Sequence, residues 1–245
     1  MALALKPGPE PRKVGVTPLQ WAAAAAAAFF ALNFVVQIAS KPSELLRFAG
    51  LGTTRAPLDT WNQYGEQFQK HATPIATADF LAAIAQVESS GDALAQPAWT
   101  WRWSTRLFGL YAPASSAVGL MQMTDGNFAQ ARRLCVKQGR VVRDCALSAL
   151  NSRLVAGHAI EMTSAFLQLS VEKTLARAPA PKAGLREKQK LAAVIHLCGP
   201  EKGPALVKAK FKPEALGRCG AHPVGPYVRR VMEQRRSFAR RMGAP

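Results

Sequence analysis

The sequence predicts a mainly α-helical protein in which an N-terminal hydrophobic helix precedes a helical domain. Apolar residues recur at helical spacing in several segments, and residues suited to helix caps flank them. No segment alternates convincingly as a strand, although residues 92–118 leave room for a short hairpin. A chain of 245 residues, nearly half of them apolar, is long enough for one good-sized domain with appendages.

The N-terminal segment, residues 1–40, predicts a membrane anchor or an export signal. Basic residues precede the apolar stretch WAAAAAAAFFALNFVVQIA (21–39), in which only Asn33 and Gln37 are polar. A stretch of about 19 residues is just long enough to cross a bilayer as a helix. We favour an uncleaved anchor, with the basic end inside and the residues after 40 exported. A cleaved export signal is the alternative.

Four cysteines fit an exported chain, because disulfides persist outside the reducing cytosol. Four cysteines allow three pairings, and sequence proximity favours Cys135–Cys145 and Cys198–Cys219, each of which closes a short loop. Buried free thiols are the alternative. The spacings do not suit a metal site.

Residues 41–75 are expected to form a tether and a lead-in helix. The tether is rich in Lys, Pro, Gly and Thr, and the helix, at 58–72, ends before Pro74.

The segment TADFLAAIAQVESSG has the pattern of a capped helix with one buried face. Thr77 is suited to the N-cap and Gly91 to the C-terminal stop. Glu88 lies four residues after Ile84 and eight after Phe80, and therefore on or beside the apolar face. Ionised carboxylates avoid apolar surroundings unless they are paired, solvated or needed there. Glu88 is therefore a candidate functional residue.

Further helices are expected over 125–136 (with Thr124 or Asp125 as cap), 149–177, 185–197 and 227–242. The last of these belongs to a basic C-terminal segment, 216–245. The 227–242 helix carries six arginines and one glutamate beside an apolar stripe, so we expect this helix to pack against the domain and expose a basic face.

Three motifs follow one another: ESSG (88–91), SAVGLMQMT (116–124) and AAVIHLCGPEKG (192–203). In this order they resemble the lysozyme-like lytic transglycosylases, enzymes with a soluble-transglycosylase catalytic domain. In that family a glutamate followed by Ser-Ser or a similar pair ends a helix. A Gly-Leu-Met-Gln segment lines the cleft opposite, and an Ala-Tyr-Asn-Ala-Gly stretch closes the site. The resemblance covers roughly residues 76–215 and implies a lysozyme-like helical domain there.

The third motif departs from the family pattern. His196 stands where the family has a tyrosine that orients the acid or the sugar, and Leu197 stands at the asparagine. Histidine can also donate a hydrogen bond, with a charge that depends on pH. A core histidine satisfied by a neighbour is the alternative.

The resemblance implies that Glu88 is the catalytic residue. It would protonate the oxygen between N-acetylmuramic acid and N-acetylglucosamine, and then take the proton of the muramic C6 hydroxyl, which closes a 1,6-anhydro ring. Such an acid must hold its proton near neutral pH, and apolar surroundings disfavour the charged form. The resemblance implies no metal and no other cofactor.

Substrate contacts are expected from residues beside these motifs. The serines suit the carboxyl, the substrate or a helix cap; the glycine lets backbone approach the sugar; the methionine gives an apolar floor. The Gln122 amide suits sugar hydroxyls or an N-acetyl carbonyl. The expected substrate-binding residues are Ser89, Ser90, Gly119, Leu120, Met121, Gln122 and His196.

Two groups of residues leave alternatives open. Glu161, on the 149–177 helix, is expected to be structural, with a role as second carboxylate as the alternative. Trp99, Trp101, Trp103 and Tyr111 could stack on sugar rings, or pack the insertion that carries them onto the domain.

The net charge of +17 argues for an anionic partner: nucleic acid, a membrane surface or an acidic polymer such as the cell wall. No nucleic-acid-binding motif is evident, so no nucleic acid is expected. Peptidoglycan glycan strands are the expected partner, together with the bacterial inner membrane through the N-terminal helix. The resemblance implies that the catalytic domain lies in the periplasm, whether anchored or released by signal cleavage. A hydrolytic muramidase and a non-catalytic peptidoglycan-binding or assembly protein are the alternatives. A role beside secretion or conjugation machinery stays open against one in wall turnover.

Overall fold

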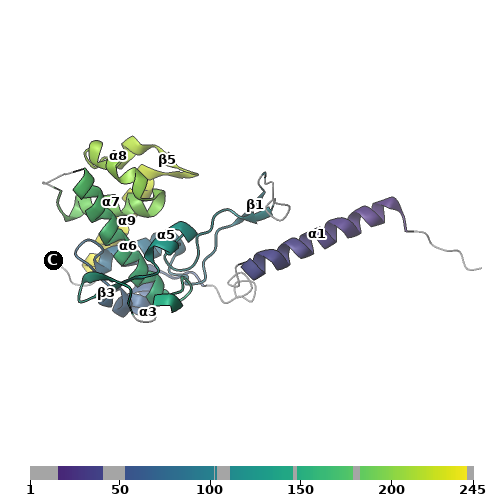
Figure 1. The fold of residues 1–245 in the computed structure, drawn as a ribbon, viewed down its shortest axis with the longest axis horizontal. Helices are drawn as coiled ribbons and strands as arrows, with labels where there is room; N and C mark the ends of the chain where they lie inside the picture. Colours follow the sequence, from purple (N-terminus) through teal and green to yellow (C-terminus); the bar gives the residue numbers. More distant parts are fainter. Residues whose placement is uncertain are drawn as a thin grey trace, which may run out of the picture.

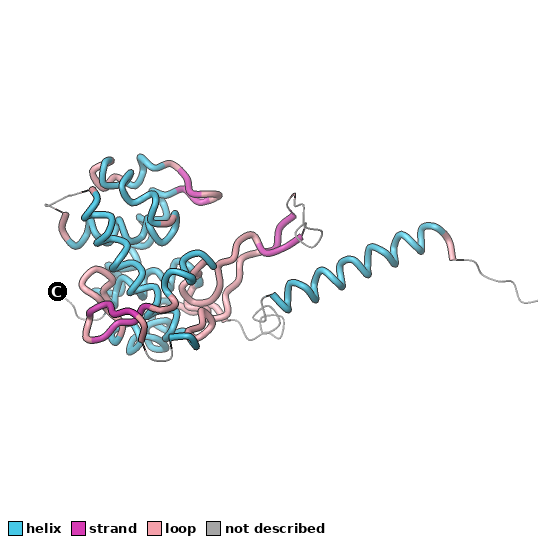
Figure 2. Tube along the Cα trace, in the orientation of Figure 1, coloured by secondary structure: helices cyan, strands magenta, loops and turns pink. Residues whose placement is uncertain are grey.

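A computed structural model describes residues 16–40, 53–101, 103, 111–145, 148–178 and 183–241. The prediction of a mainly helical chain with an N-terminal apolar helix is confirmed (Figure 1). Strands within the described residues form short two-stranded ribbons at the edges of the helices (Figure 2).

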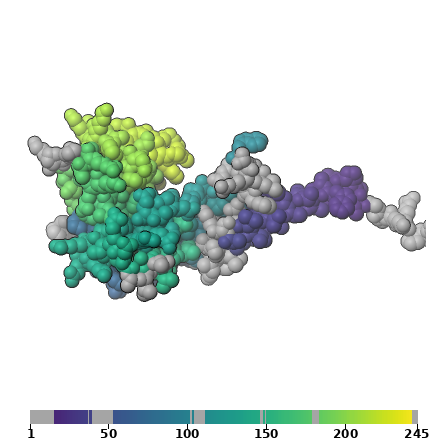
Figure 3. Space-filling model, in the orientation of Figure 1, coloured from purple at the N-terminus to yellow at the C-terminus, as the bar shows by residue number. Residues whose placement is uncertain are grey.

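The N-terminal helix α1 (Pro18–Ser40) projects from the rest of the molecule as a rod (Figure 3). Its segment Pro18–Val36 is long and apolar enough to cross a membrane, and little of it is buried. Such a helix fits a membrane span or a signal sequence. Of the tether predicted ahead of the 58–72 helix, residues 41–52 lie outside the described residues.

One apolar core holds the helical domain together, and α4 (Ala78–Ser89) lies at its centre. Phe80, Leu81 and Ile84 of this helix are fully buried. The helix ends where Ser90 and Gly91 take positive φ angles of 51° and 73°, as expected for a C-terminal stop. The surrounding helices are α3 (Pro57–Lys70), α6 (Ala156–Arg177), α7 (Leu185–Cys198) and α9 (Val224–Arg241).

The C-terminal helix α9 packs along α4 with its apolar side, as its sequence predicts. Val228, Val231 and Phe238 are buried. Arg235 Nε donates to Asp79 Oδ2 over 2.7 Å, which joins α9 to the first turn of α4. Thr77 occupies the predicted N-cap position, but its hydroxyl donates to the Asp79 carboxylate and caps no backbone N–H.

Two predicted helices differ from the sequence expectation. The helix expected over 125–136 ends early as α5 (Asp125–Ala131), and β3 (Leu134–Lys137) pairs antiparallel with β4 (Arg140–Arg143). The tight turn at Gln138 and Gly139, both with positive φ, lets the chain reverse. The helix expected from 149 begins only at Ala156, after a 3₁₀ turn over Ser148–Leu150.

The hairpin allowed for within 92–118 is present as β1 (Trp99–Trp101) and β2 (Tyr111–Pro113). Both disulfides form as predicted, Cys135–Cys145 beside the β3–β4 ribbon and Cys198–Cys219 between the end of α7 and β5. The short elements between α7 and α9 are α8 (Gly203–Lys208), β5 (Arg218–Cys219) and β6 (His222–Pro223), with 3₁₀ turns over Pro200–Lys202 and Pro213–Leu216.

The Gly-Leu-Met-Gln segment is a tight turn held between Val118 and Met123, which form an isolated antiparallel bridge. Arg153 clamps it, because its guanidinium donates to the carbonyls of Ser116 and Met123, each over 2.8 Å. Gly119 has a φ of +76°, and a Cβ there would overlap the Arg153 carbonyl oxygen. The turn therefore requires glycine at this position.

We expect Gly119→Ala to destabilise the fold by about 1–3 kcal/mol, because it adds both backbone strain and a clash with backbone. The matched control is Gly126→Ala in α5, where an added Cβ has no neighbour within 4 Å; alanine there should be neutral or stabilising. Thermal unfolding of the full chain in detergent measures both. Equal midpoints for the two variants would contradict this account of the turn.

Candidate active site

A cavity of about 700 Å³ opens at the C-terminal end of α4. Its polar lining comes from elements far apart in sequence: α4, the 118–123 turn, the end of α7, the β5–β6 turn and the start of α9. Among the described residues that line it, Glu88 is the only carboxylate. The described side chains in the cavity lining that carry a nitrogen atom or a phenol group are Gln96, Gln122, His196, His222, Tyr227 and Arg230.

Glu88 is held in this cavity by two side chains. The Tyr227 hydroxyl donates to Glu88 Oε1 over 2.5 Å, and His196 Nε2 lies 3.6 Å from the same oxygen. The Glu88 side chain is only 17% exposed. The expectation that Glu88 lies at the edge of the apolar face, with limited access to water, therefore fits the geometry.

Tyr227 is built to donate a hydrogen bond. Burial raises the pKa of its hydroxyl well above the ordinary value, and the neighbouring Glu88 charge and hydrogen bond act in the same direction, against the opposing effect of Arg230. The phenol therefore stays protonated over the physiological range. A buried donor of this kind fixes the orientation of the carboxyl group that accepts from it.

His196 is both a buried residue and a neighbour of the candidate acid. It is 8% exposed and ends α7 beside Glu88. His196 is therefore buried as a core histidine would be, and it also lies next to Glu88 as an orienting residue would. The close hydroxyl contact that the family pattern suggests at position 196 comes from Tyr227 on α9 instead.

Sequence reasoning missed Tyr227 as a site residue. Its separation from Glu88 is 139 residues, and it lies beyond the 76–215 range of the resemblance. A signal was nevertheless present. Tyr227 begins the apolar stripe of the last helix, and a buried tyrosine hydroxyl normally requires a partner.

Ser89 and Ser90 both have backbone partners that explain them. Ser89 Oγ lies 2.9 Å from the Ala85 carbonyl and 2.8 Å from the Leu120 carbonyl, so it links α4 to the turn opposite. Ser90 is the left-handed C-cap residue, and its carbonyl accepts from the Arg55 N–H over 2.7 Å. Helix capping, one of the alternatives weighed for this pair, fits Ser90, and backbone carbonyls engage the Ser89 hydroxyl. Contact of either serine with substrate stays a prediction.

The turn residues divide into supports and one cavity residue. Gly119 faces backbone of Arg153, and Leu120 and Met121 are fully buried in the core. These three residues are enclosed by protein, which fits a role in supporting the site, and their contact with substrate stays a prediction.

Gln122 does line the cavity. Its Nε2 donates to the carbonyls of Ala95 and Gly119, each over 2.9 Å. The amide hydrogens are thus used within the protein, and Oε1 is the atom left to meet a ligand. An acceptor suits a sugar hydroxyl or an N-acetyl N–H better than an N-acetyl carbonyl, and the contact of Gln122 with substrate stays a prediction.

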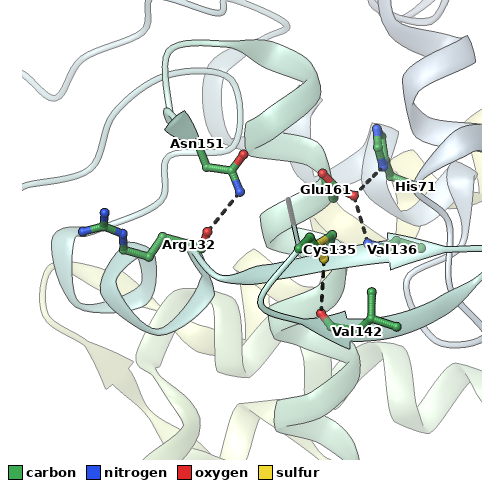
Figure 4. The surroundings of a disulfide bond; sticks show 8 residues. His71, Arg132, Cys135, Val136, Val142, Asn151 and Glu161 are labelled. Carbon is green, nitrogen blue, oxygen red and sulfur yellow. Dashed lines mark hydrogen bonds and ion pairs between the residues drawn. A yellow bond between two sulfur atoms is a disulfide. The ribbon is translucent and has the colours of Figure 1, made fainter. Parts of the chain in front are cut away.

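Glu161 lies in a different place, in a cavity of about 720 Å³ whose described lining residues are all different from those of the first. Its Oε1 accepts from the Val136 N–H over 2.9 Å and lies 3.4 Å from His71 Nδ1, at the end of α3 (Figure 4). Burial would raise the pKa of Glu161, but these two contacts and the charge of nearby histidines lower it. The expected structural role, bonding to a neighbouring helix end, fits this geometry.

The tryptophans of the 97–115 segment do not line the Glu88 cavity. Trp99 and Trp101 lie in β1, beyond the cavity residues Pro97 and Ala98, and their ring partners include Phe34 and Phe30 of α1. These contacts favour packing rather than sugar stacking as the role of these tryptophans. The surface on which they pack is α1, whereas packing onto the helical domain was the alternative expected from the sequence.

Comparisons of the chain with protein-family models, curated proteins and solved structures found no match. The site therefore has to be interpreted from its own geometry.

The raised pKa of Tyr227 predicts a pH-dependent stability. The unfolded phenol loses its proton near pH ~10, whereas the folded one retains it to higher pH. Its stabilising contribution is therefore complete below about pH 10 and declines as the pH rises beyond it. We expect Tyr227→Phe to show a shallower loss of thermal stability above pH ~10 than the parent chain. Parallel curves for the two proteins would contradict the assignment.

Proposed function

We propose that this protein is a peptidoglycan lytic transglycosylase whose helical domain has a lysozyme-like fold. The observation that carries the proposal is Glu88, the one carboxylate among the described residues of a large cavity, with the Tyr227 hydroxyl donating to one of its oxygens. The motifs that resemble the family meet at this cavity: Glu88 from the first, Gln122 from the second and His196 from the third.

Glu88 acts first as a general acid. In the protonated form that this step requires, Oε1, which accepts from Tyr227, is the carbonyl oxygen and Oε2 carries the acidic proton. Transfer of this proton to the glycosidic oxygen lets the leaving sugar depart. Tyr227 then bonds to an ionised carboxylate, and this charge-assisted bond is stronger than the one in the ground state. The same hydrogen bond therefore favours the transfer.

Glu88 then acts as the base. The carboxylate takes the proton of the muramic C6 hydroxyl, whose oxygen bonds to C1 and closes the 1,6-anhydro ring. Glu88 returns to its protonated form, and no water is consumed. The substrate's own N-acetyl group and donors in the cavity stabilise the positively charged sugar carbon.

The lack of a second carboxylate among the described cavity residues supports this route over a two-carboxylate hydrolase. Retaining and inverting hydrolases place their carboxyl groups about 5–10 Å apart across the scissile bond. Asp92 and Asp125 are engaged elsewhere: Asp92 Oδ1 accepts from the Leu94 N–H, and Asp125 pairs with Arg153 over 2.7 Å. Glu161 lines the other cavity.

Charge and compartment agree with a cell-wall substrate. Arg230 lies at the cavity, and the net charge of +17 attracts an anionic polymer. The two disulfides and the apolar helix α1 fit export. We propose that α1 remains as an anchor and that the domain acts in the periplasm.

The Glu88→Gln variant should stay folded and lose activity by about 10²–10⁴-fold, because an amide can neither donate nor take the required proton. The matched control is Glu161→Gln, which removes a carboxylate from the other cavity and should still form products. Mass spectrometry of digested sacculi measures both, and the parent chain should give anhydro-muropeptides. Retained cleavage by Glu88→Gln, or loss of cleavage by a folded Glu161→Gln, would overturn the assignment.

Tyr227→Phe should lower the rate of cleavage by about 10–150-fold, as a hydrogen bond to a charged group contributes about 1.5–3 kcal/mol. Tyr64→Phe is the matched control, since this buried tyrosine lines the Glu161 cavity; its rate should stay near that of the parent. The account fails if the two variants have the same rate.

A further inference from the structure

The β1–β2 hairpin reaches away from the helical domain and contacts α1 (Figure 1). Asn33 Nδ2 donates to the Tyr111 carbonyl over 3.0 Å. Phe30 meets Trp101 edge-on, with ring centroids 5.9 Å apart, and Phe34 lies 6.4 Å from Trp99 by the same measure. The contact is thus aromatic with one polar bond at its centre.

The position of this contact along α1 coincides with one end of the apolar segment. Asn33 lies three residues before Val36, where that segment ends, which is about 4.5 Å along the helix axis. If α1 spans a bilayer, the hairpin therefore lies at the boundary between hydrocarbon and headgroups. Tryptophan and tyrosine are enriched at that level of membrane proteins.

A cavity of about 390 Å³ lies between the helix and the hairpin, lined by Phe30, Asn33, Phe34, Trp99 and Tyr111. Asn33 is only 1% exposed, yet its Oδ1 has no hydrogen-bond partner among the described residues. The same holds for Trp99 Nε1. An apolar cavity with one unpartnered acceptor and one unpartnered donor suits a molecule that is mostly hydrocarbon with a polar ester or hydroxyl group.

Two tryptophans at this hairpin stay largely exposed, although one of them meets Phe30 of α1. Trp101 is 65% exposed and Trp103 is fully exposed, whereas Trp61 in the helical domain packs between Phe68 and Phe238. Exposed tryptophans next to an apolar helix form a surface that water solvates poorly and a membrane interface accommodates.

We propose that the β1–β2 hairpin is a second membrane-contacting element, which lies in the lipid interface beside α1 and holds a phospholipid in the cavity between them. The proposal rests on α1 remaining as a membrane span. The hairpin also connects directly to the active-site cavity, since Pro97, Ala98, Ala114 and Ser115 line that cavity and flank the two strands. It therefore fixes the height of Glu88 above the membrane and directs cleavage to glycan strands near the membrane surface.

The test is quenching of tryptophan fluorescence by brominated lipid. The full chain is reconstituted in vesicles of phosphatidylcholine and phosphatidylglycerol whose acyl chains carry bromine near the headgroup. Subtracting the emission of the Trp101→Phe/Trp103→Phe double variant from that of the parent isolates the hairpin tryptophans. Trp61→Phe isolates the domain control in the same way, and Trp21→Phe isolates a tryptophan near the other end of α1.

We expect the hairpin emission to fall by about half or more in brominated vesicles, as Trp21 emission does, while the Trp61 contribution is unchanged. Hairpin emission that is quenched by aqueous iodide and not by brominated lipid would overturn the proposal. Trp21 emission that escapes brominated lipid would overturn it too, together with the anchor. Neither result depends on cleavage of peptidoglycan, so failure here is distinguishable from failure of the proposed enzymatic activity.

Discussion

The hydrogen bond from Tyr227 to Glu88 depends on how α9 packs along α4, and the candidate site depends on that hydrogen bond. The apolar stripe of α9 buries Val228, Val231 and Phe238 in the core, and the Asp79–Arg235 ion pair ties the other end of the helix pair. With the register between the helices fixed in this way, the first turn of α9 presents the Tyr227 hydroxyl to the last turn of α4. A glutamate at a helix end, the ordinary place for a solvated carboxylate, is thereby oriented and left only 17% exposed.

The opposite wall of the cavity is positioned by a chain of backbone contacts. The hydroxyl of Ser89, next to Glu88, donates to the Leu120 carbonyl. The Arg153 guanidinium donates to two backbone carbonyls that flank the same turn. The tightness of this turn requires Gly119 and aims Gln122 at the cavity. A few side chains of these motifs thus face the cavity, and their neighbours in the sequence hold those side chains in position.

The sequence predicts local features well and contacts between distant segments poorly. The α4 helix, its stop after Glu88 and the apolar stripe of α9 follow from periodicity and capping residues. Tyr227 was missed because its contact with Glu88 is made by tertiary packing across 139 residues. Residues 134–136, which belong to β3, were predicted as the end of the helix that begins at 125. The predicted Cys135–Cys145 loop, closed over ten residues around Gly139, already favoured a hairpin there.

The central claim is that Glu88 alone carries both proton transfers, so that the C6 hydroxyl of the substrate takes the place of water. Digestion of sacculi in water enriched in oxygen-18 tests this claim most directly. The account predicts that the muropeptides released by the parent chain carry no heavy oxygen, because the new bond at C1 is made by the sugar's own oxygen. One heavy oxygen at each new reducing end would contradict it and would make the protein a hydrolase.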